Sequence, residues 1–355
     1  MTTPRLEIHL DRISHNARQL AALCASKGIA IAAVTKGVCG SPEIGAALVQ
    51  SGIQVLADSR LANLRRMREA GIAAQYILIR SPKMSEVEQV VQLADVSLNT
   101  EMQVVRELAR HAAGQGKVHG VIWMVELGDL REGLLKSAVP DAARETLSLP
   151  GVELAGVGTN LGCFSGIKPT QSKMLELSDI AARIQERFGI KLKVVSGGNS
   201  ANYEWLVSTS HAGLINQLRI GEAILLGRET LYRRPIPGLY TDAFTLIAEV
   251  IECQLKPSAP DGEVALDAFG HVSHTEDRGS RRRIILALGE QDTATSAIQP
   301  RIEAEILGGQ QRPSCPRHRG PRPQGGSRGS IRCPVRGTPA SDDFSVRAEG
   351  LLVIV

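Results

Sequence analysis

The sequence predicts an α/β protein built as a (β/α)8 TIM barrel followed by a C-terminal β-rich domain. Between about residues 28 and 235, short aliphatic runs alternate with longer amphipathic stretches. Beyond about residue 240, strand-like runs follow one another with no long helix between them. The chain has 355 residues, 43% hydrophobic and only 3% aromatic, which is long enough for both parts and requires a mainly aliphatic core.

Eight segments of the first part have the composition of buried strands. They are 29–35, 53–58, 75–80, 96–99, 121–127, 154–160, 192–198 and 217–227. Amphipathic stretches lie between them; Leu61, Leu64 and Met67, for example, recur at helical spacing before Gly71. Eight strand and helix units in a stretch of this length are typical of a TIM barrel, whose active-site residues lie at the C-terminal ends of the strands.

The composition divides the chain into three parts. We expect the barrel over 1–238, with residues 1–10 holding a strand that joins the β domain. We expect an incomplete β domain over 239–308, with strands in 243–255, 263–269 and 281–289. The linker "RRPIPG" marks the boundary between them.

The tail, residues 309–355, differs from the rest in charge and composition. It carries eight Arg, no Lys and three acidic residues, so its formal charge is +5. Because the whole chain has a formal net charge of +4, residues 1–308 carry −1. It also carries six of the seventeen prolines and has no hydrophobic period. One interpretation is a disordered basic arm that binds anionic partners such as nucleic acid. We favour another: one extra base near codon 308 has replaced the true C-terminus, which leaves the β domain without its last strands and impairs this chain.

Other classes of protein have little support in the sequence. No run of about 18 apolar residues and no secretory signal occur, so we expect a cytoplasmic protein without a membrane partner. The six cysteines form no CxxC pair and no metal-ligand spacing, which indicates reduced thiols and no metal site. Because residues 1–308 are almost neutral, we expect no nucleic-acid partner.

The stretch "GIAIAAVTKGVCG" places Lys36 at the end of the first barrel strand. A partly buried lysine at such a position can act as an amine nucleophile and form a Schiff base. A lone lysine can equally extend from the strand end into solvent. Lys36 therefore needs support from other residues.

That support comes from two late strands. The stretch "VVSGGNSAN" follows a strand with Ser196, Gly197, Gly198 and Asn199, whose backbone N–H groups and polar side chains suit a phosphate. A tight strand-to-helix turn would have the same composition. One strand later, Arg219 comes just before Gly221. Barrels commonly bind phosphate at their late strands, so an amine on the first strand and a phosphate site here suit pyridoxal 5′-phosphate.

The motifs "VTKGVCG", "ADSRLANL", "VELGDLREGL", "GVGTNLGCF", "SGGNSAN" and "LRIGEAILLG", in this order, carry a family resemblance. The chain resembles the alanine racemase-like fold type III family over about residues 5–308. It is most similar to the branch of amino-acid racemases that includes ornithine racemase. The resemblance implies a pyridoxal-phosphate-dependent racemase that interconverts L- and D-amino acids and works as a homodimer if its C-terminal domain is intact.

The same resemblance implies a role for each matched residue. Lys36 matches the lysine that holds the cofactor as an internal aldimine and acts as one racemising base. Arg219 matches the arginine that faces the pyridine nitrogen, and Arg131 matches an arginine that contacts the phenolic oxygen. Asn160 stands beside the ring where the family often has histidine. The phosphate-binding positions are Ser196, Gly197, Gly198, Asn199 and Gly221.

Racemisation needs a second acid/base on the opposite face of the substrate. The family's tyrosine has no counterpart in "LALGEQD", and the candidates are Cys163, which we take as the catalytic choice, Asp292 and Glu290. For the substrate, Glu126, Asp129 and Glu132 beside Arg131 favour a basic amino acid, ornithine or lysine, although acidic residues at a strand end are also commonly solvated or paired.

Asp58, Ser59 and Arg60 support the cofactor lysine or cap the next helix, and the sequence favours neither. The main alternative function is a non-catalytic pyridoxal-phosphate-binding protein of the barrel-only type. That alternative fits less well because this chain continues beyond the barrel. A decarboxylase of the same fold type ranks third.

Overall fold

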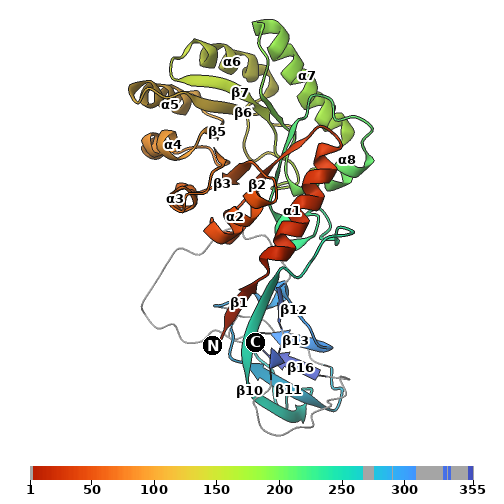
Figure 1. Cartoon of the computed structure of the whole chain (residues 1–355). Helices are drawn as coiled ribbons and strands as arrows, with labels where there is room; N and C mark the ends of the chain where they lie inside the picture. Colours follow the sequence, from red (N-terminus) through yellow and green to blue (C-terminus); the bar gives the residue numbers. More distant parts are fainter. Residues whose placement is uncertain are drawn as a thin grey trace. The chain divides into compact units, whose positions relative to one another are not determined.

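The computed structural model describes residues 3–266, 276–289 and 291–308, together with three short strands beyond residue 330. The described chain divides into two compact units, Leu10–Thr241 and Met1–His9 with Asp242–Val355. Each unit has its own sheet (Figure 1). No helix among the described residues is both long enough and apolar enough to span a bilayer.

The first unit is a closed barrel of eight parallel strands, which confirms the predicted fold class. Helices follow the strands and lie outside the ring (Figure 1). The strands are β2 (Ala30–Val34), β3 (Val55–Asp58), β4 (Gln75–Leu78), β5 (Val96–Asn99), β6 (His119–Met124), β7 (Val152–Gly158), β8 (Val194–Ser196) and β9 (Gln217–Ile220). The barrel closes where β2 pairs with β9, with Ala32 opposite Arg219 and Ala33 opposite Ile220.

The α-helices of this unit are α1 (Leu10–Ala25), α2 (Pro42–Gln50), α3 (Leu61–Glu69), α4 (Val87–Leu93), α5 (Met102–Gly114), α6 (Val139–Ser148), α7 (Gln171–Phe188), α8 (Tyr203–Ser208) and α9 (Glu222–Leu226). Short 3-10 helices are η1 (Lys36–Val38), η2 (Met84–Glu86), η3 (Lys136–Ala138) and η4 (Ser200–Asn202). The longest helix, α7, begins at the N-cap Thr170, whose side chain accepts the Lys173 N–H, and ends at Gly189 in the left-handed conformation.

Aliphatic side chains fill the barrel, as the low aromatic content requires. One buried cluster contains Ala32, Val34, Ala57, Ile77, Val96, Leu98, Ile122, Met124 and Ala155, contributed by β2 to β7. The barrel interior is therefore a packed core, and functional side chains are left to the strand ends.

The segment 217–227 supplies the eighth strand of the barrel, as predicted, and also a short helix. Strand β9 ends at Ile220, Gly221 is the N-cap of α9, and the helix runs to Leu226. An apolar run of this kind fits a buried strand and a buried helix equally well, so periodicity alone does not separate them.

The second unit contains a mixed sheet of β1 (Arg5–Ile8), β10 (Phe244–Pro257), β11 (Ser280–Leu286), β12 (Ile298–Pro300), β13 (Ala304–Gly308), β14 (Ile331–Cys333), β15 (Val335–Arg336) and β16 (Leu351–Ile354), with a 3-10 turn, η5 (Thr295–Ala297), before β12. Strand β1 pairs antiparallel with β10, and β10 pairs antiparallel with β11. Leu246, Ala248, Ile284, Leu286, Leu288 and Ile298 form its buried core.

Two predicted segments of this unit are only partly described. Residues 263–266 belong to no named strand, and the rest of the segment 263–269 lies outside the described residues. Of the tail, the structure describes only β14, β15 and β16; β16 pairs with β11 and β13. The other tail residues, and with them the frameshift hypothesis, lie outside the described part.

Candidate active site

The residues singled out in the sequence collect at the C-terminal end of the barrel. Lys36 stands two residues beyond the last residue of β2, and Asp58 is the last residue of β3. Ser196 is the last residue of β8, and Arg219 lies on β9. Since parallel strands of one barrel end at the same rim, these side chains share one end of the barrel.

Lys36 begins the 3-10 turn η1, and its side chain is exposed. Of the two conformations considered for this lysine, partly buried or extended into solvent, the structure shows the second, because Lys36 stands beyond the strand and not within it. Its ammonium has no hydrogen bond or ion pair with any residue that the structure describes. The amine therefore lies at the rim of the barrel, accessible to a reactant.

Arg219 is the buried cation of this rim. The residue as a whole is only 4% exposed. It donates to the Ser196 hydroxyl at 2.5 Å, to the Thr159 carbonyl at 2.7 Å and to Asn160 Oδ1 at 3.4 Å. All three acceptors are neutral, so no carboxylate bonds directly to the guanidinium among the described residues.

Burial lowers the pKa of Arg219 to about 10; the nearby Glu132 carboxylate opposes this shift, whereas the Arg131 guanidinium adds to it. Arg219 thus still carries its proton at neutral pH. A buried guanidinium without a counter-ion in contact favours a hydrogen-bond acceptor, and a pyridine nitrogen is such a group.

The "SGGN" loop uses several of its polar groups internally. The Ser196 hydroxyl donates to Gln217 Oε1, and the Gly197 N–H donates to the Gln217 carbonyl. The Asn199 N–H donates to Asn202 Oδ1, while its side-chain amide donates to Asn160 Oδ1 at 2.9 Å. These bonds fix the shape of the loop and join Asn199, Asn160 and Arg219 into one network.

Two glycines let the backbone approach its neighbours closely. Gly198 has φ +142°, and a Cβ there would lie 2.2 Å from Asn202 Oδ1. Its N–H has no acceptor within the described part of the chain. At Gly221, a Cβ would lie 2.9 Å from the Val34 carbonyl oxygen. Both positions therefore require glycine, and the Gly198 N–H is a free donor for an anion.

A second cluster of charged side chains, Arg131 and Glu132, lies beside Cys163. Arg131 forms a two-point ion pair with Glu132 and donates to the Cys163 thiol. Its hydrogen bonding to the Glu132 carboxylate is the main cause that raises the pKa of Arg131. Cys163 is exposed in the loop between β7 and α7. Its hydrogen bond from Arg131 brings these two predicted site residues together.

Asp129 has a role that sequence reasoning missed. It is 2% exposed, and its carboxylate accepts the backbone N–H groups of Cys163 at 3.4 Å, Phe164 at 2.8 Å and Ser165 at 3.2 Å. Its backbone carbonyl also accepts the Ser165 hydroxyl. Asp129 therefore holds the β7–α7 loop and does not face a substrate. Partners 34 to 36 residues away give no signal in a single sequence.

The other acidic candidates that the structure describes have partners of their own. Glu126 accepts the Gly128 N–H, and Glu132 is paired with Arg131. In the second unit, the Asp292 carboxylate accepts the Gly289 N–H within a local turn. Glu290 lies outside the described residues.

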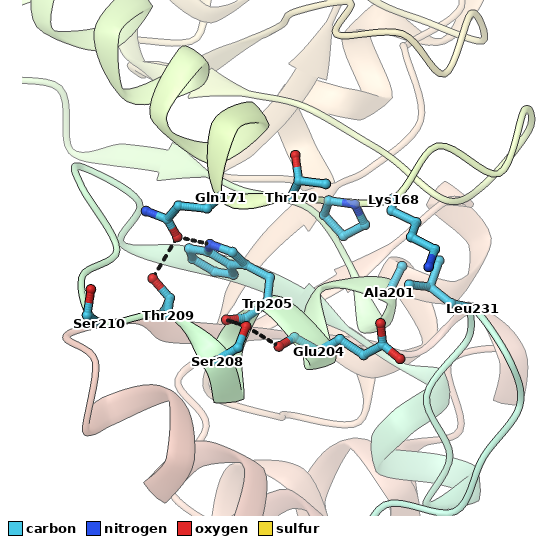
Figure 2. A pocket seen from close by; sticks show the side chains of 11 residues that line it. Lys168, Thr170, Gln171, Ala201, Glu204, Trp205, Ser208, Thr209, Ser210 and Leu231 are labelled. Carbon is cyan, nitrogen blue, oxygen red and sulfur yellow. Dashed lines mark hydrogen bonds between the residues drawn. The ribbon is translucent and has the colours of Figure 1, made fainter.

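A separate hollow of about 300 Å³ lies beside α8 and the start of α7 (Figure 2). Trp205 and Thr209 both donate to Gln171 Oε1 on one side of it, and Lys168 and Glu204 line the other. None of the residues assigned above to the cofactor lines this hollow. No cluster of three or more His, Cys, Asp or Glu suited to a metal ion occurs among the described residues.

Comparison with known proteins gives the family. The model of the alanine racemase N-terminal domain matches residues 8–229. The chain belongs to this family. Among curated proteins, it is 38% identical over 307 residues to an ornithine racemase from Acetoanaerobium sticklandii, covering 86% of each chain. It is also 38% identical over 300 residues to a lysine racemase from Thermotoga maritima, covering 84% of each.

Solved structures of an alanine racemase and of a D-threonine aldolase share the fold. An alanine racemase from Clostridium difficile matches with a TM-score of 0.62 and 15% identity, covering 82% of this chain and 74% of its own. A D-threonine aldolase from Filomicrobium marinum matches with a TM-score of 0.59 and 18% identity, covering 71% and 70%. Because proteins named for different reactions share this fold, the fold does not decide the reaction.

Proposed function

We propose that this protein is a pyridoxal-phosphate-dependent racemase of a basic amino acid, ornithine or lysine. The observation that carries the proposal is the 38% identity to an ornithine racemase and a lysine racemase over more than four fifths of each chain. The geometry supports it, since an exposed lysine and a buried arginine share one end of the barrel. A homodimer is part of the proposal.

The residues present fit pyridoxal phosphate. Lys36 would supply the amine that attaches the cofactor, and Arg219 would donate a hydrogen bond to the pyridine nitrogen. The phosphate would bind at Gly198, in the segment with Ser196, Gly197 and Asn199, and at Gly221, the N-cap of α9, and Asn160 and Arg131 would lie beside the ring. When bound, this cofactor withdraws electrons from the substrate Cα and so makes its proton removable. Because Arg219 keeps its own proton, it limits that withdrawal and favours racemisation over transamination.

Two groups of the chain move the proton. The Lys36 amine acts on one face of the substrate Cα, as one of the racemising bases. We assign the other face to Cys163, because its thiol lies against Arg131 and its loop is held by Asp129. Asp292 is less suited, since its carboxylate closes a turn in the second unit.

We propose that the carboxylates of Glu132 and Glu126 attract the distal ammonium of the substrate. Asp129 is not proposed for it, because three backbone N–H groups occupy its carboxylate. The non-catalytic barrel-only carrier is the less favoured alternative, because this chain has a second unit with its own sheet.

A substrate panel tests the proposal. The protein is incubated with pyridoxal phosphate and L-ornithine, L-lysine, L-alanine or L-glutamate, and the D-isomer is measured by chiral chromatography. We expect D-isomer from ornithine or lysine at a rate at least tenfold above the rate from alanine and glutamate. A protein that attaches the cofactor and converts none of the four contradicts the racemase and supports the carrier.

A further inference from the structure

The turn that carries Lys36 is held by a buried carboxylate on the neighbouring strand. Asp58, the last residue of β3, is fully buried. Its Oδ2 accepts a 2.7 Å hydrogen bond from the Thr35 hydroxyl, and Thr35 is the residue directly before Lys36. The Thr35 carbonyl in turn accepts the N–H groups of Val38 and Gly40, which close the turn. The position of Thr35 therefore sets the position of the whole turn.

The other oxygen of Asp58 bonds to the start of α3. Oδ1 accepts the Arg60 N–H at 2.9 Å and the Asn63 side-chain amide at 2.9 Å. The N-cap of α3 is Arg60, whose side chain makes no capping bond, so the segment 58–60 contributes both to the Lys36 turn and to the start of α3. Asp58 thus ties the β2 turn to the β3–α3 junction.

Asn63 also limits the far end of the same turn. A Cβ on Gly40, which has φ +62°, would lie 2.7 Å from the Asn63 Cβ. Asn63 therefore packs directly against Gly40 while it donates to Asp58. Both ends of the turn around Lys36 are fixed by groups that Asp58 holds.

Burying this carboxylate is costly. Desolvation raises the pKa of Asp58, and its hydrogen bonds from Thr35, Arg60 and Asn63 oppose that rise. No lysine or arginine pairs with the Asp58 carboxylate among the described residues. If this residue served packing alone, an apolar side chain would make the strand end more stable.

We propose that Asp58 is a positioning residue that fixes the Lys36 turn by accepting hydrogen bonds from Thr35 on one side and from α3 on the other. The proposal rests on the proposed function for its consequence, since Lys36 is the amine that attaches the cofactor. Displacing a reactive group by about 1 Å can cost a factor of about 100 in rate.

The test uses two substitutions that separate the effect of the Thr35 hydroxyl from the effect of the side-chain shape. Thr35→Ser keeps the hydroxyl that bonds to Asp58, whereas Thr35→Val keeps the shape and loses the hydroxyl. Thr146→Val is the matched control, because Thr146 is also a fully buried threonine with a bonded hydroxyl, on α6 beside Trp123. In each full-length variant, we would measure the rate of borohydride-reducible attachment of pyridoxal phosphate to Lys36 and the hydrogen exchange of the Val38 and Gly40 amides.

We expect Thr35→Val to slow attachment at least tenfold and to speed exchange of both amides at least tenfold. Thr35→Ser and Thr146→Val should stay within about threefold of the wild type in both measurements. The proposal is overturned if Thr35→Val behaves as the wild type, or if Thr146→Val has the same effect. If the wild type attaches no cofactor, the proposed function is wrong, and the exchange data still decide the role of Asp58.

Discussion

Arg219 on β9 donates a 2.5 Å hydrogen bond to the hydroxyl of Ser196 at the end of β8, and both side chains are buried. This bond orients a charged guanidinium toward the rim of the barrel, where the other acceptors within reach are the Thr159 carbonyl and Asn160 Oδ1. A charge buried among neutral acceptors reduces the stability of the fold, so its presence is better explained by function than by packing.

The first prediction concerns that conflict between stability and function. Burial lowers the pKa of Arg219 to about 10, so the folded state disfavours its charge by up to about 3 kcal/mol at neutral pH. We expect Arg219→Met to leave the free energy of unfolding of the cofactor-free protein unchanged within about 1 kcal/mol, or to raise it. Racemase activity should fall at least about 100-fold. Urea unfolding and the ornithine assay check both, and a stability loss above about 2 kcal/mol would contradict the interpretation.

A second prediction concerns Asp129. Removing its carboxylate in Asp129→Ala leaves three backbone N–H groups without an acceptor, so we expect a loss of about 2–3 kcal/mol in the free energy of unfolding. Exchange of the Cys163, Phe164 and Ser165 amides should become faster. Asp141→Ala is the control, since the Asp141 side chain is 71% exposed and should cost under about 0.5 kcal/mol. Equal losses in the two variants would rule out the loop-holding role.

The pH dependence of stability is expected to report on His119. This side chain is 2% exposed and bonds to the Ser97 hydroxyl, and burial lowers its pKa from 6.5 to about 4. The unfolded state therefore binds the proton first, so the stability contributed by neutral His119 is complete above pH 6.5 and is lost as the pH falls toward 4. The loss amounts to at most about 3 kcal/mol.

The measurement is urea unfolding at several pH values between 4 and 7. His119→Gln should show a smaller decrease over this range than the wild type. His211→Gln, which changes an exposed histidine, should keep the wild-type decrease. An unchanged decrease in His119→Gln would assign the pH dependence to other groups.

The sequence predicted the barrel because aliphatic runs and amphipathic stretches alternate, and a rim site because its motifs follow those runs. Within residues 217–227 it predicted the strand but not the short helix that begins at Glu222, because an apolar run fits a buried strand and a buried helix equally well. It also placed Asp129 among the substrate-binding groups, since the loop that fills its carboxylate is distant in sequence. Tertiary hydrogen bonds of this kind leave no local pattern.

A further prediction concerns the tail. The matches to the two racemases extend over 307 and 300 residues, a length close to the 308 residues before the tail. We expect resequencing across codon 308 to find one extra base. We also expect a chain with the restored frame to be more soluble and to bind more cofactor than this one, because complete strands leave fewer unpaired sheet edges. Equal solubility and cofactor content in the two chains would contradict the frameshift.

The central claim is that the turn after β2 carries the cofactor lysine. Its most direct test is borohydride reduction of the protein with pyridoxal phosphate, followed by digestion and mass spectrometry, for the wild type, Lys36→Ala and the control Lys27→Ala. We predict one labelled peptide containing Lys36 in the wild type and in Lys27→Ala, and none in Lys36→Ala. Labelling that persists in Lys36→Ala, or that maps to another lysine in the wild type, would contradict the claim.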